Sequence, residues 1–324
     1  MKRALNFSDG TLVPLTGDWE KTMSSKIILG ENQYGKAEVR VVKITRDTNR
    51  HEIEDLNVTS QLRGDFAAAH LEGDNAHVVA TDTQKNTIYA FARDGIGSPE
   101  AFLLRLGEHF TSSFDWVTGG RWEAESYAWN RIQAHGSEHD HSFVRNGQEV
   151  RTAVLVRDGA ATHLISGLKD LTVLKSTESG FVGYPRDRYT TLPETTDRIL
   201  ATDVSARWRF KAGTDFSSLD FNKSYDDVKG LLLEGFTEKY SHALQQTLFD
   251  MGAKVLEAHS EIDEIKFSMP NKHHFLVDLS PFGLDNPNEV FFAADRPYGL
   301  IEATVQRDDA TAAPAAWSGI AGFC

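Results

Sequence analysis

The alternation of apolar and polar residues predicts paired strands in the first third of the chain. Residues 37–46, AEVRVVKITR, alternate as a strand does, and residues 51–66, HEIEDLNVTSQLRGDF, resume the alternation after the polar turn DTNR. These two stretches predict a long antiparallel hairpin. Residues 76–92, AHVVATDTQKNTIYAFA, predict an apolar strand that leads into a polar break, and residues 121–129, RWEAESYAW, predict a further strand.

Helix signals separate these strands. The triplet Ser98-Pro99-Glu100 is typical of a helix start. In the second half of the chain, a capped helix is predicted from Ser224 and an amphipathic segment from Ala243. The apolar stripes of these three segments consist of Phe102, Leu103, Leu106 and Phe110, then Val228, Leu231, Leu232 and Phe236, then Leu248, Met251 and Val255.

The second half repeats the order of the first, and the triplet Ala-Thr-Asp of residues 80–82 returns at residues 201–203. We therefore expect an α+β fold of two tandem units, each an antiparallel sheet with helices on one face. The expected division is an N-terminal extension over residues 1–26, a first module over 27–160 and a second module with a C-terminal tail over 161–324.

Turn signals and sheet edges add two expectations. Asn146-Gly147 and Asp158-Gly159 are candidate hairpin turns and argue for more antiparallel strands. Antiparallel sheets of this kind leave open edges, which aggregate unless they are paired. We therefore expect a homo-oligomer in which a second copy closes the sheet into a barrel.

The charge balance narrows the choice of partners. The 324 residues carry 34 Lys and Arg against 47 Asp and Glu, a formal net charge of −13, and 40% of them are hydrophobic. Such a chain can bury a substantial core, and its charge repels nucleic acid and anionic lipid. An anionic small molecule stays possible, because a local cluster of basic side chains outweighs a distant, screened field.

The single cysteine and the motifs at the chain ends bear on the cellular compartment of the protein. The only cysteine is Cys324, so no intrachain disulfide is possible and a reducing compartment fits. The sequence shows neither a signal peptide nor a long apolar run, and its last residues, AGFC, match neither a prenylation motif nor the Ser-Lys-Leu peroxisomal address. We expect a cytoplasmic protein that makes no contact with a membrane.

Residues 268–279, SMPNKHHFLVDL, place polar side chains at the mouth of an apolar strand. The alternation sets Asn271 and His273 on the same face as Phe275. Alone, His273 would be interpreted as a core histidine that a backbone carbonyl satisfies. With Asn271 beside it, two polar groups enter an apolar layer and need partners, and a bound polar ligand supplies them.

A histidine-rich stretch, residues 135–143 (HGSEHDHSF), offers a competing site. His135, His139 and His141, with Glu138 and Asp140 between them, could hold zinc or copper. The stretch also contains Gly and Ser, has no neighbouring cysteine and connects two predicted strands. We therefore favour a solvated connection with incidental histidines.

Three further polar positions have a functional and an ordinary interpretation. Lys36 is either a solvated lysine or, in a desolvated pocket, a group that handles protons. Thr81 and Asp82 lie at the expected end of an apolar strand, where they either build a polar site or close a turn.

The same is true of three residues in the second half. Arg198 precedes an apolar run, and its planar guanidinium either pairs with Asp197 or binds a planar anion. Gln245 is either an exposed helix former or an amide donor and acceptor for the edge of a heterocycle. The ring of Phe181 either packs in the hydrophobic core or stacks on a ligand.

Several long stretches, in the same order, closely resemble the uricase (urate oxidase) family. They are QYGKAEVRVVK (33–43), NAHVVATDTQKNTIYAFAR (75–93), LTVLKSTESGFVGYPRDRYTTLPETTDRILATDV (171–204) and SMPNKHHFLVDL (268–279). The likeness runs from about Gln33 to Arg307. It implies the tunnelling fold, with two tandem ββααββ modules per chain, sheets of two chains closing into a barrel, and barrels stacking into a homotetramer.

The resemblance implies which residues bind the substrate. Arg198 and Gln245 would hold opposite edges of planar urate, and Phe181 would stack on its face. Leu192 and the backbone around Leu244 would shape the pocket.

It also implies a set of residues for the chemistry. Lys36 and Thr81 would form a proton-handling pair, joined by His273. Asn271 would hold dioxygen or water above the purine, and Asp82 would support the purine site. The resemblance places Thr81 and Asp82 on a neighbouring chain relative to the other site residues.

The implied reaction is oxidation of urate by dioxygen to 5-hydroxyisourate and hydrogen peroxide, with no metal, flavin or other cofactor. A doubly deprotonated urate is electron rich and can pass an electron to dioxygen directly. Two alternatives are a non-catalytic purine- or pterin-binding module that keeps Arg198, Gln245 and Phe181, and a metal-dependent oxidase built on the histidine-rich stretch.

Overall fold

A computed structural model describes residues 27–320 and Phe323. The expected extension over residues 1–26 and the cysteine at position 324 lie outside the described residues. Residues Gln33–Cys324 form one compact unit, separate from Met1–Asn32, and everything below concerns the described part of that larger unit.

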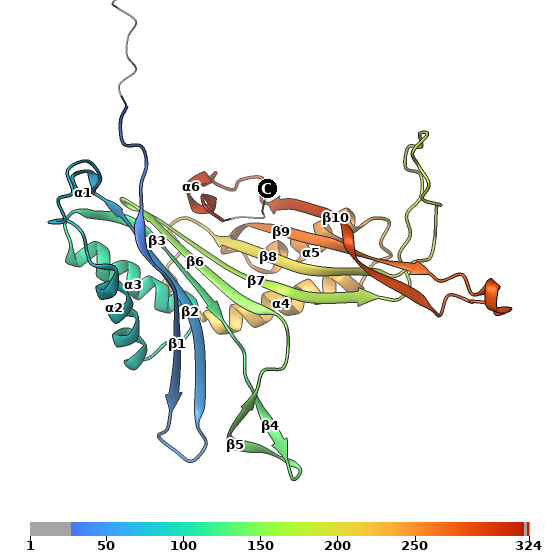
Figure 1. Ribbon diagram of the computed structural model, residues 1–324, viewed down its shortest axis with the longest axis horizontal. Coiled ribbons are helices and arrows are strands. Elements are labelled where there is room, and N and C mark those ends of the chain that lie inside the picture. The colour runs from blue at the N-terminus through green and yellow to red at the C-terminus, as the bar shows by residue number, and fades with distance from the viewer. Residues whose placement is uncertain (1–26, 321–322, 324) are drawn as a thin grey trace, which may run out of the picture. The chain divides into compact units, whose positions relative to one another are not determined.

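One antiparallel sheet of eight strands is the framework of this unit (Figure 1). Its strands lie in the spatial order β1, β2, β3, β6, β7, β8, β9, β10, so β1 and β10 form its edges. The strands are β1 (Tyr34–Thr45), β2 (Glu52–Gly64), β3 (Val117–Ser126), β6 (Val150–Asp158), β7 (Ala161–Lys175), β8 (Leu200–Phe210), β9 (Ile262–Leu276) and β10 (Phe291–Gln306). A separate two-stranded hairpin, β4 (Asn130–Ala134) with β5 (Ser137–Val144), projects from the connection between β3 and β6.

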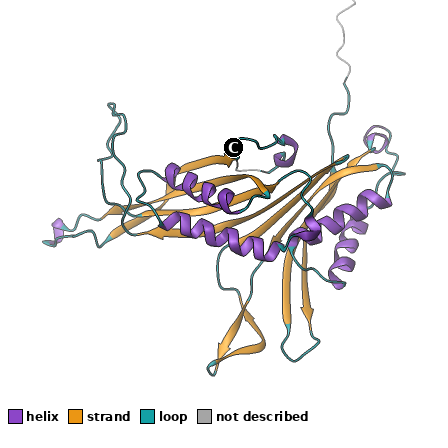
Figure 2. Cartoon of the chain, turned by 180° about the vertical axis from the view of Figure 1, so that it is seen from behind, coloured by secondary structure: helices purple, strands orange, loops and turns teal. Residues whose placement is uncertain are grey.

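Four long helices cover one face of the sheet (Figure 2). They are α2 (Thr81–Arg93), α3 (Pro99–Ser113), α4 (Phe221–Thr237) and α5 (Leu244–Ala258). Two shorter helices are α1 (Ala67–Leu71) and α6 (Pro314–Trp317), and α6 packs on the opposite face of β6 and β7. The expected α+β fold, with an antiparallel sheet and helices on one face, is confirmed.

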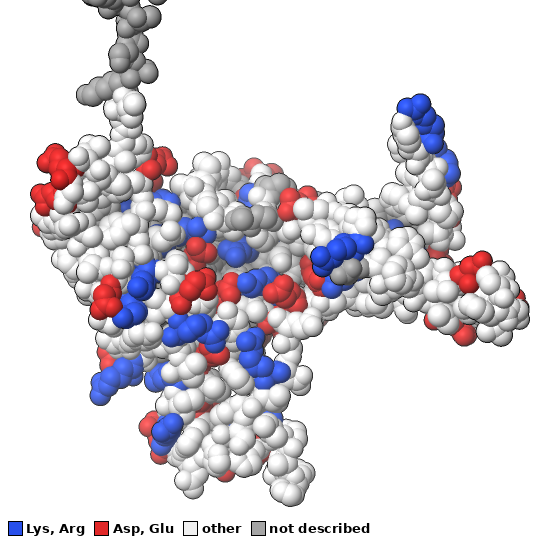
Figure 3. All heavy atoms as spheres, viewed as in Figure 1, with Lys and Arg blue, Asp and Glu red and all other residues white. Residues whose placement is uncertain are grey.

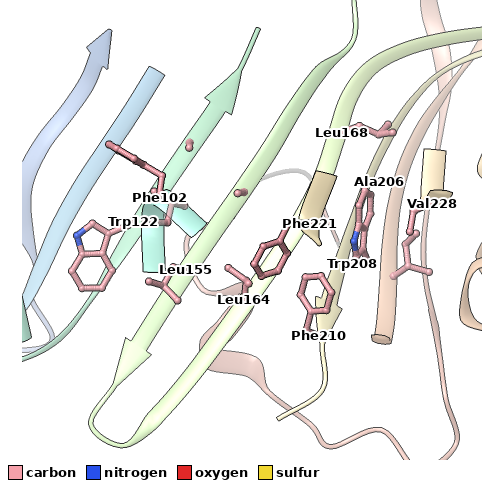
Figure 4. Packing of buried hydrophobic residues seen from close by; sticks show 14 of the residues in the cluster. Phe102, Trp122, Leu155, Leu164, Leu168, Ala206, Trp208, Phe210, Phe221 and Val228 are labelled. Carbon is pink, nitrogen blue, oxygen red and sulfur yellow. The ribbon is translucent and has the colours of Figure 1, made fainter. Parts of the chain in front are cut away.

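The core lies between the sheet and these four helices (Figure 4). Alternate strand residues enter it, among them Trp122 of β3 and Trp208 of β8, which are fully buried. Phe102 of α3 and Val228 of α4 meet them from the helix side. The period of two along the strands and the period of about 3.6 along the helices therefore converge on one apolar layer.

Several sequence-based predictions are confirmed. The predicted first hairpin is β1 with β2, in which Thr45 pairs with Glu52. The side chain of Ser98 accepts a hydrogen bond from the amide of Ala101 and caps α3. Asp158 pairs with Ala161 across the turn that Gly159 begins, so this turn does join a hairpin.

Three predictions were wrong. The stretch predicted as a strand with a polar break is helix α2, because its buried positions Gln84, Ile88 and Ala92 recur every four residues. Helix α4 begins at Phe221, three residues before Ser224, because Asp220 accepts hydrogen bonds from two amides of its first turn. Asn146-Gly147 closes no hairpin, because β5 pairs with β4 whereas β6 pairs with β3.

The order of elements repeats, as expected. β1, β2, α2, α3, β3 and β6 are followed by β7, β8, α4, α5, β9 and β10, two strands, two helices and two strands each time. The hairpin of β6 and β7 continues one sheet across this junction, so the division into two modules at residue 160 stays a prediction. None of the helices in the described ranges is long and apolar enough to cross a membrane.

The face opposite the long helices carries basic and acidic side chains side by side (Figure 3). Ion pairs there include Lys169 with Glu125 and Lys272 with Asp203, at 2.5 and 2.6 Å. The charges of this face therefore largely compensate one another, although the whole chain is acidic.

A buried carboxylate joins both halves of the sheet to the helices. Glu100 of α3 has no exposed surface, and it accepts hydrogen bonds from Arg151 of β6 and Ser166 of β7, each at 2.7 Å. Arg151 also donates to Asn222 of α4 at 2.7 Å. This network ties two strands to one helix of each half.

Replacing Arg151 by methionine leaves the Glu100 carboxylate buried without its cation. We expect the free energy of unfolding to fall by about 3–5 kcal/mol, the usual cost of breaking a buried ion pair. Urea denaturation at fixed protein concentration measures it. As the control, Lys223→Met removes the exposed pair with Asp227 and should leave the midpoint unchanged. Equal midpoints for both variants would contradict the prediction.

Candidate active site

Backbone hydrogen bonds hold Phe181 and Arg198 in adjacent positions although long loops surround them. Phe181 and Thr195 exchange two bonds, at 2.7 and 3.1 Å, and the amide of Arg198 donates to the carbonyl of Ser179 at 2.9 Å. On its other side, Ser179 forms a parallel bridge with Ser241, just before α5. Three segments distant in sequence therefore meet in one small ribbon.

The ribbon needs glycine at position 180. A Cβ atom there would lie 2.2 Å from the hydroxyl oxygen of Tyr240, and that hydroxyl donates to the carbonyl of Thr196 at 2.6 Å. Because the tyrosine is held by this bond, a side chain at Gly180 would force the segments apart.

Arg198 is a half-buried cation with neutral neighbours. Its Nε donates to the hydroxyl of Ser179 at 3.2 Å, and its guanidinium lies 5.3 Å from the centre of the Phe181 ring. Within the described ranges no carboxylate forms an ion pair with it, and Asp197, the partner considered from the sequence, accepts instead from Thr177 at 2.8 Å. Burial lowers the pKa of Arg198 from its ordinary value, a sign that the guanidinium is short of solvent and counter-charge.

Stacked rings connect Phe181 to the loop that carries Leu192. The rings of Phe181 and Tyr184 are 4.7 Å apart with planes inclined by 14°. The hydroxyl of Tyr184 donates to the carbonyl of Leu192 at 2.6 Å. Leu192 itself is half exposed, so it lies at the rim of the ribbon.

Helix α5 begins next to this ribbon, because Ser241, three residues before its first residue, bridges Ser179. Leu244 is buried at its first position, and Gln245 is exposed at the second. The residue before it, Ala243, offers no side-chain cap. The first amides of α5 therefore keep hydrogen-bonding capacity and a partial positive charge, which suits an anion.

Strand β9 supplies Asn271 and His273 as the alternation predicted. Both share the face of the buried Met269, toward the helices, and Asn271 pairs with Thr202 of β8. Burial lowers the pKa of His273, and the charge of Arg198 and then His274 lower it further. His273 is therefore mainly neutral at neutral pH, and it lies within electrostatic reach of Arg198.

Three other predicted site residues lie on β1 and α2. Lys36 is in β1, and Thr81 and Asp82 are the first two residues of α2. The pKa of Asp82 is lowered mainly by Lys85, and the charge of Lys36 contributes too, so Lys36 lies near Asp82. The resemblance had set only Thr81 and Asp82 apart from the other residues, and the structure adds Lys36 to them.

The two groups lie far apart in one chain. β1 and β9 are separated by six strand spacings in the sheet, a path of roughly 29 Å at about 4.8 Å per strand. The first group is Lys36, Thr81 and Asp82, and the second is Phe181, Leu192, Arg198, Leu244, Gln245, Asn271 and His273. A single chain therefore keeps the two groups at well-separated places along the sheet.

The histidine-rich stretch is the hairpin of β4 and β5, and only part of it comes together. The rings of His139 and His141 are 4.5 Å apart, whereas His135 lies in the turn before β5. The neighbouring Asp140 pairs with Arg50 at 3.5 Å. Among the described residues no group of three or more His, Cys, Asp or Glu side chains is placed to hold a metal ion.

Sequence reasoning missed three small hydroxyl residues of the second group. Ser179 and Ser241 are buried and build the ribbon, and Thr202 is buried across from Asn271 without a hydrogen-bond partner among the described atoms. The alternation of β8 could have revealed Thr202, because it shares the core face with Leu200 and Val204. No local pattern marks the two serines, whose role depends on segments distant in sequence.

These features define a class: an α+β protein with an eight-stranded antiparallel sheet, a half-buried guanidinium beside an aromatic ring, and a separate group of polar residues at the far edge of that sheet. Comparisons with known proteins agree. The family model described as Uricase matches residues 32–156 and 164–302. The chain belongs to the uricase family.

Named relatives cover nearly the whole chain. It is 65% identical over 310 residues to a uricase of Arthrobacter globiformis, which covers 96% of this chain and 100% of that protein, and 37% identical over 295 residues to a uricase of Schizosaccharomyces pombe, at 88% and 100%. The crystal structure of the Arthrobacter globiformis uricase superposes with a TM-score of 0.86 at 66% identity, over 91% of this chain and 100% of that one. A uricase structure from Bacillus fastidious gives 0.73 at 26% identity, over 85% and 93%.

Removing the charge of Arg198 should raise the pKa of His273. In Arg198→Met the repulsion of the imidazolium disappears while burial persists, so we expect a rise that stops short of the ordinary value of about 6.5. Titration of the histidine ring by NMR measures the shift. The control is Arg188→Gln, on the exposed loop beside Tyr189, which should leave the pKa of His273 in place. An unchanged pKa in Arg198→Met would mean that the two side chains do not share a site.

Proposed function

We propose that the protein catalyses the oxidation of urate by dioxygen to 5-hydroxyisourate and hydrogen peroxide. Urate gives up two electrons to dioxygen, and water supplies the hydroxyl group of the product. Family membership supports this reaction. The single structural observation that carries it is the environment of Arg198. This guanidinium is half-buried, and no carboxylate among the described residues forms an ion pair with it. Urate is a planar anion near neutral pH, so it matches the guanidinium in charge and shape.

The substrate-binding roles follow from the second group. Arg198 and Gln245 hold opposite edges of the purine, and Phe181 stacks on one face. Leu192 closes the rim and the backbone around Leu244 lines the helix end. A charge-assisted, two-pronged bond in a site shielded from water is strong enough to fix the orientation of the ring.

The proton chemistry belongs mainly to the first group. Lys36 and Thr81 remove the second proton of urate, and Asp82 keeps this pair and the purine in place. His273, whose pKa is lowered by burial and by the charge of Arg198, continues the proton path as a neutral imidazole. Asn271 holds dioxygen or water above the ring. The dianion then reduces dioxygen directly, so the proposed reaction needs no metal or flavin.

A complete site requires a second copy of the chain, because one chain separates Lys36 from Arg198. The open edges β1 and β10 offer backbone groups for pairing. The far end of the β9 and β10 hairpin exposes Phe275, Phe282 and Phe292, an apolar surface that a partner would cover. We propose a homotetramer with its active sites at subunit interfaces. The cytoplasmic location stays a prediction.

The reaction is tested by mixing chelator-treated protein with urate in air. We expect the ultraviolet absorbance of urate to fall and hydrogen peroxide to appear in equal amount. Folded protein that binds urate without consuming oxygen would instead be a non-catalytic purine-binding module. Activity that chelation abolishes and added metal restores would point to a metal-dependent oxidase.

The location of the sites is tested by mixing two impaired variants and measuring turnover at a urate concentration below the raised KM. Arg198→Ala should raise KM by about 10- to 100-fold, because a charged hydrogen bond is lost. Lys36→Met should lower kcat by about 100-fold or more, the usual contribution of a proton-transfer group. If each site takes Lys36 from one chain and Arg198 from another, co-refolding equal amounts should restore about a quarter of the sites.

The control for this mixing experiment is the double variant that carries both substitutions in one chain, co-refolded with wild-type protein. That mixture has the same numbers of intact and altered residues, so it corrects for assembly yield. No recovery from the two single variants, in oligomers shown to be mixed, would place Lys36 and Arg198 in the same chain's site and refute the interfacial arrangement.

A further inference from the structure

A fully buried amide lies next to the first group of site residues and has no part in the roles given above. Gln84 of α2 has no exposed surface. Its Oε1 accepts a hydrogen bond from the hydroxyl of Ser60 at 2.9 Å, and its Nε2 donates to the carbonyl of Val79 at 3.4 Å. Ser60 is equally buried. A buried polar pair is costly unless its geometry is fixed, so this bond holds α2 and β2 in one relative position.

The bond connects the two elements that carry the proposed proton-handling pair. Ser60 is the cross-strand partner of Lys36 in the hairpin of β1 and β2. Side chains of directly paired residues project to the same side of a sheet, so Lys36 leaves β1 toward α2, as Ser60 does. Gln84 lies one helical turn after Thr81, on the same side of α2. Its amide thus links the strand of Lys36 to the helix that begins at Thr81.

The backbone around this bond is unusually constrained. A Cβ atom at Gly35 would lie 1.8 Å from the carbonyl oxygen of Ser60, so only glycine lets the strands approach this closely before Lys36. The pairing register shifts directly after Lys36. The hydroxyl of Tyr34 donates to the carbonyl of Val79 at 3.1 Å. β1 is therefore tied to the start of α2 through Tyr34, two residues before Lys36.

We propose that Gln84 is a positioning residue for the reaction, and that it sets the distance between the Lys36 ammonium group and the Thr81 hydroxyl. The inference rests on the proposed function. Proton transfer requires donor and acceptor within about 3 Å, so a small movement of α2 against β1 costs rate. Substrate binding, which uses Arg198, Gln245 and Phe181, does not depend on this contact.

The first test replaces Gln84 by methionine, which has a similar size and no amide. We expect kcat to fall by about 10-fold or more while KM for urate stays within about twofold. The matched control is Ser166→Ala, which removes another buried hydrogen bond between a strand and a helix, that to Glu100. This control should lower stability and leave kcat unchanged. An equal loss of kcat in both variants would overturn the proposal.

A second measurement separates positioning from general loosening of the fold. In a Lys36→Met background, Gln84→Met should lower kcat no further, because the residue acts through Lys36. Gln84→Glu should recover kcat relative to the wild type as pH falls, since a protonated carboxyl group reproduces both hydrogen bonds. A full effect of Gln84→Met in the Lys36→Met background would overturn the proposal.

Should Gln84→Met fail to fold, Ser60→Ala breaks the same bond by removing one oxygen atom. An unchanged kcat in folded Ser60→Ala overturns the role of the bond. Wild-type protein that consumes no urate overturns the proposed function and this inference together. Wild-type turnover with unaffected Gln84→Met or Ser60→Ala variants overturns this inference alone.

Discussion

The continuous hydrogen-bonded sheet between β1 and β9 is the constraint on which the rest of this structure depends. Each strand between them is paired on both sides, and no strand can leave the ladder without exposing buried backbone groups. Lys36 and Arg198 therefore cannot approach each other within a chain. The same sheet ends in two open edges, which are hazardous in a monomer. The homotetramer proposed above answers both constraints: a partner chain pairs the edges and brings the first group of residues to the second.

The charges around Arg198 bear on which ligand the second group of residues would bind. The chain carries a net charge of −13, and its sheet face opposite the long helices is covered by compensating ion pairs. Arg198 is an exception, since the Ser179 hydroxyl and the Phe181 ring accompany it without neutralising it. Holding a half-buried cation in this way costs stability. In the proposed function, the binding of planar urate offsets that cost, because urate brings both a negative charge and an aromatic face.

The sequence predicted what local periodicity encodes. Alternation of apolar and polar residues predicted the first hairpin and the shared face of Asn271 and His273. Capping chemistry predicted the start of α3 at Ser98. Helix α2 was missed because Val78 and Val79 favour a strand, while the four-residue spacing that indicates a helix starts only at Gln84. The sequence predicted that Lys36 pairs with Thr81, but it missed that both stand near each other in one chain, for a different reason. That proximity depends on strand order in the sheet, which no local pattern specifies, and the turn predicted at Asn146-Gly147 failed in the same way.

The four long helices differ in whether a side chain caps their N-terminus. Helices α3 and α4 begin with side-chain caps from Ser98 and Asp220, whereas α2 and α5 follow Ala80 and Ala243, which provide none. A cap is worth about 1 kcal/mol, so two uncapped helices give up measurable stability. Among the four long helices, these two are the ones whose first turns carry proposed site residues, Thr81 and Asp82 in α2 and Leu244 and Gln245 in α5. At α5, a capping carboxylate or hydroxyl would occupy the amides beside Gln245 and place acceptor atoms where an anion should bind. In the proposed site, the absence of a cap, unfavourable for the helix alone, keeps that end available to urate.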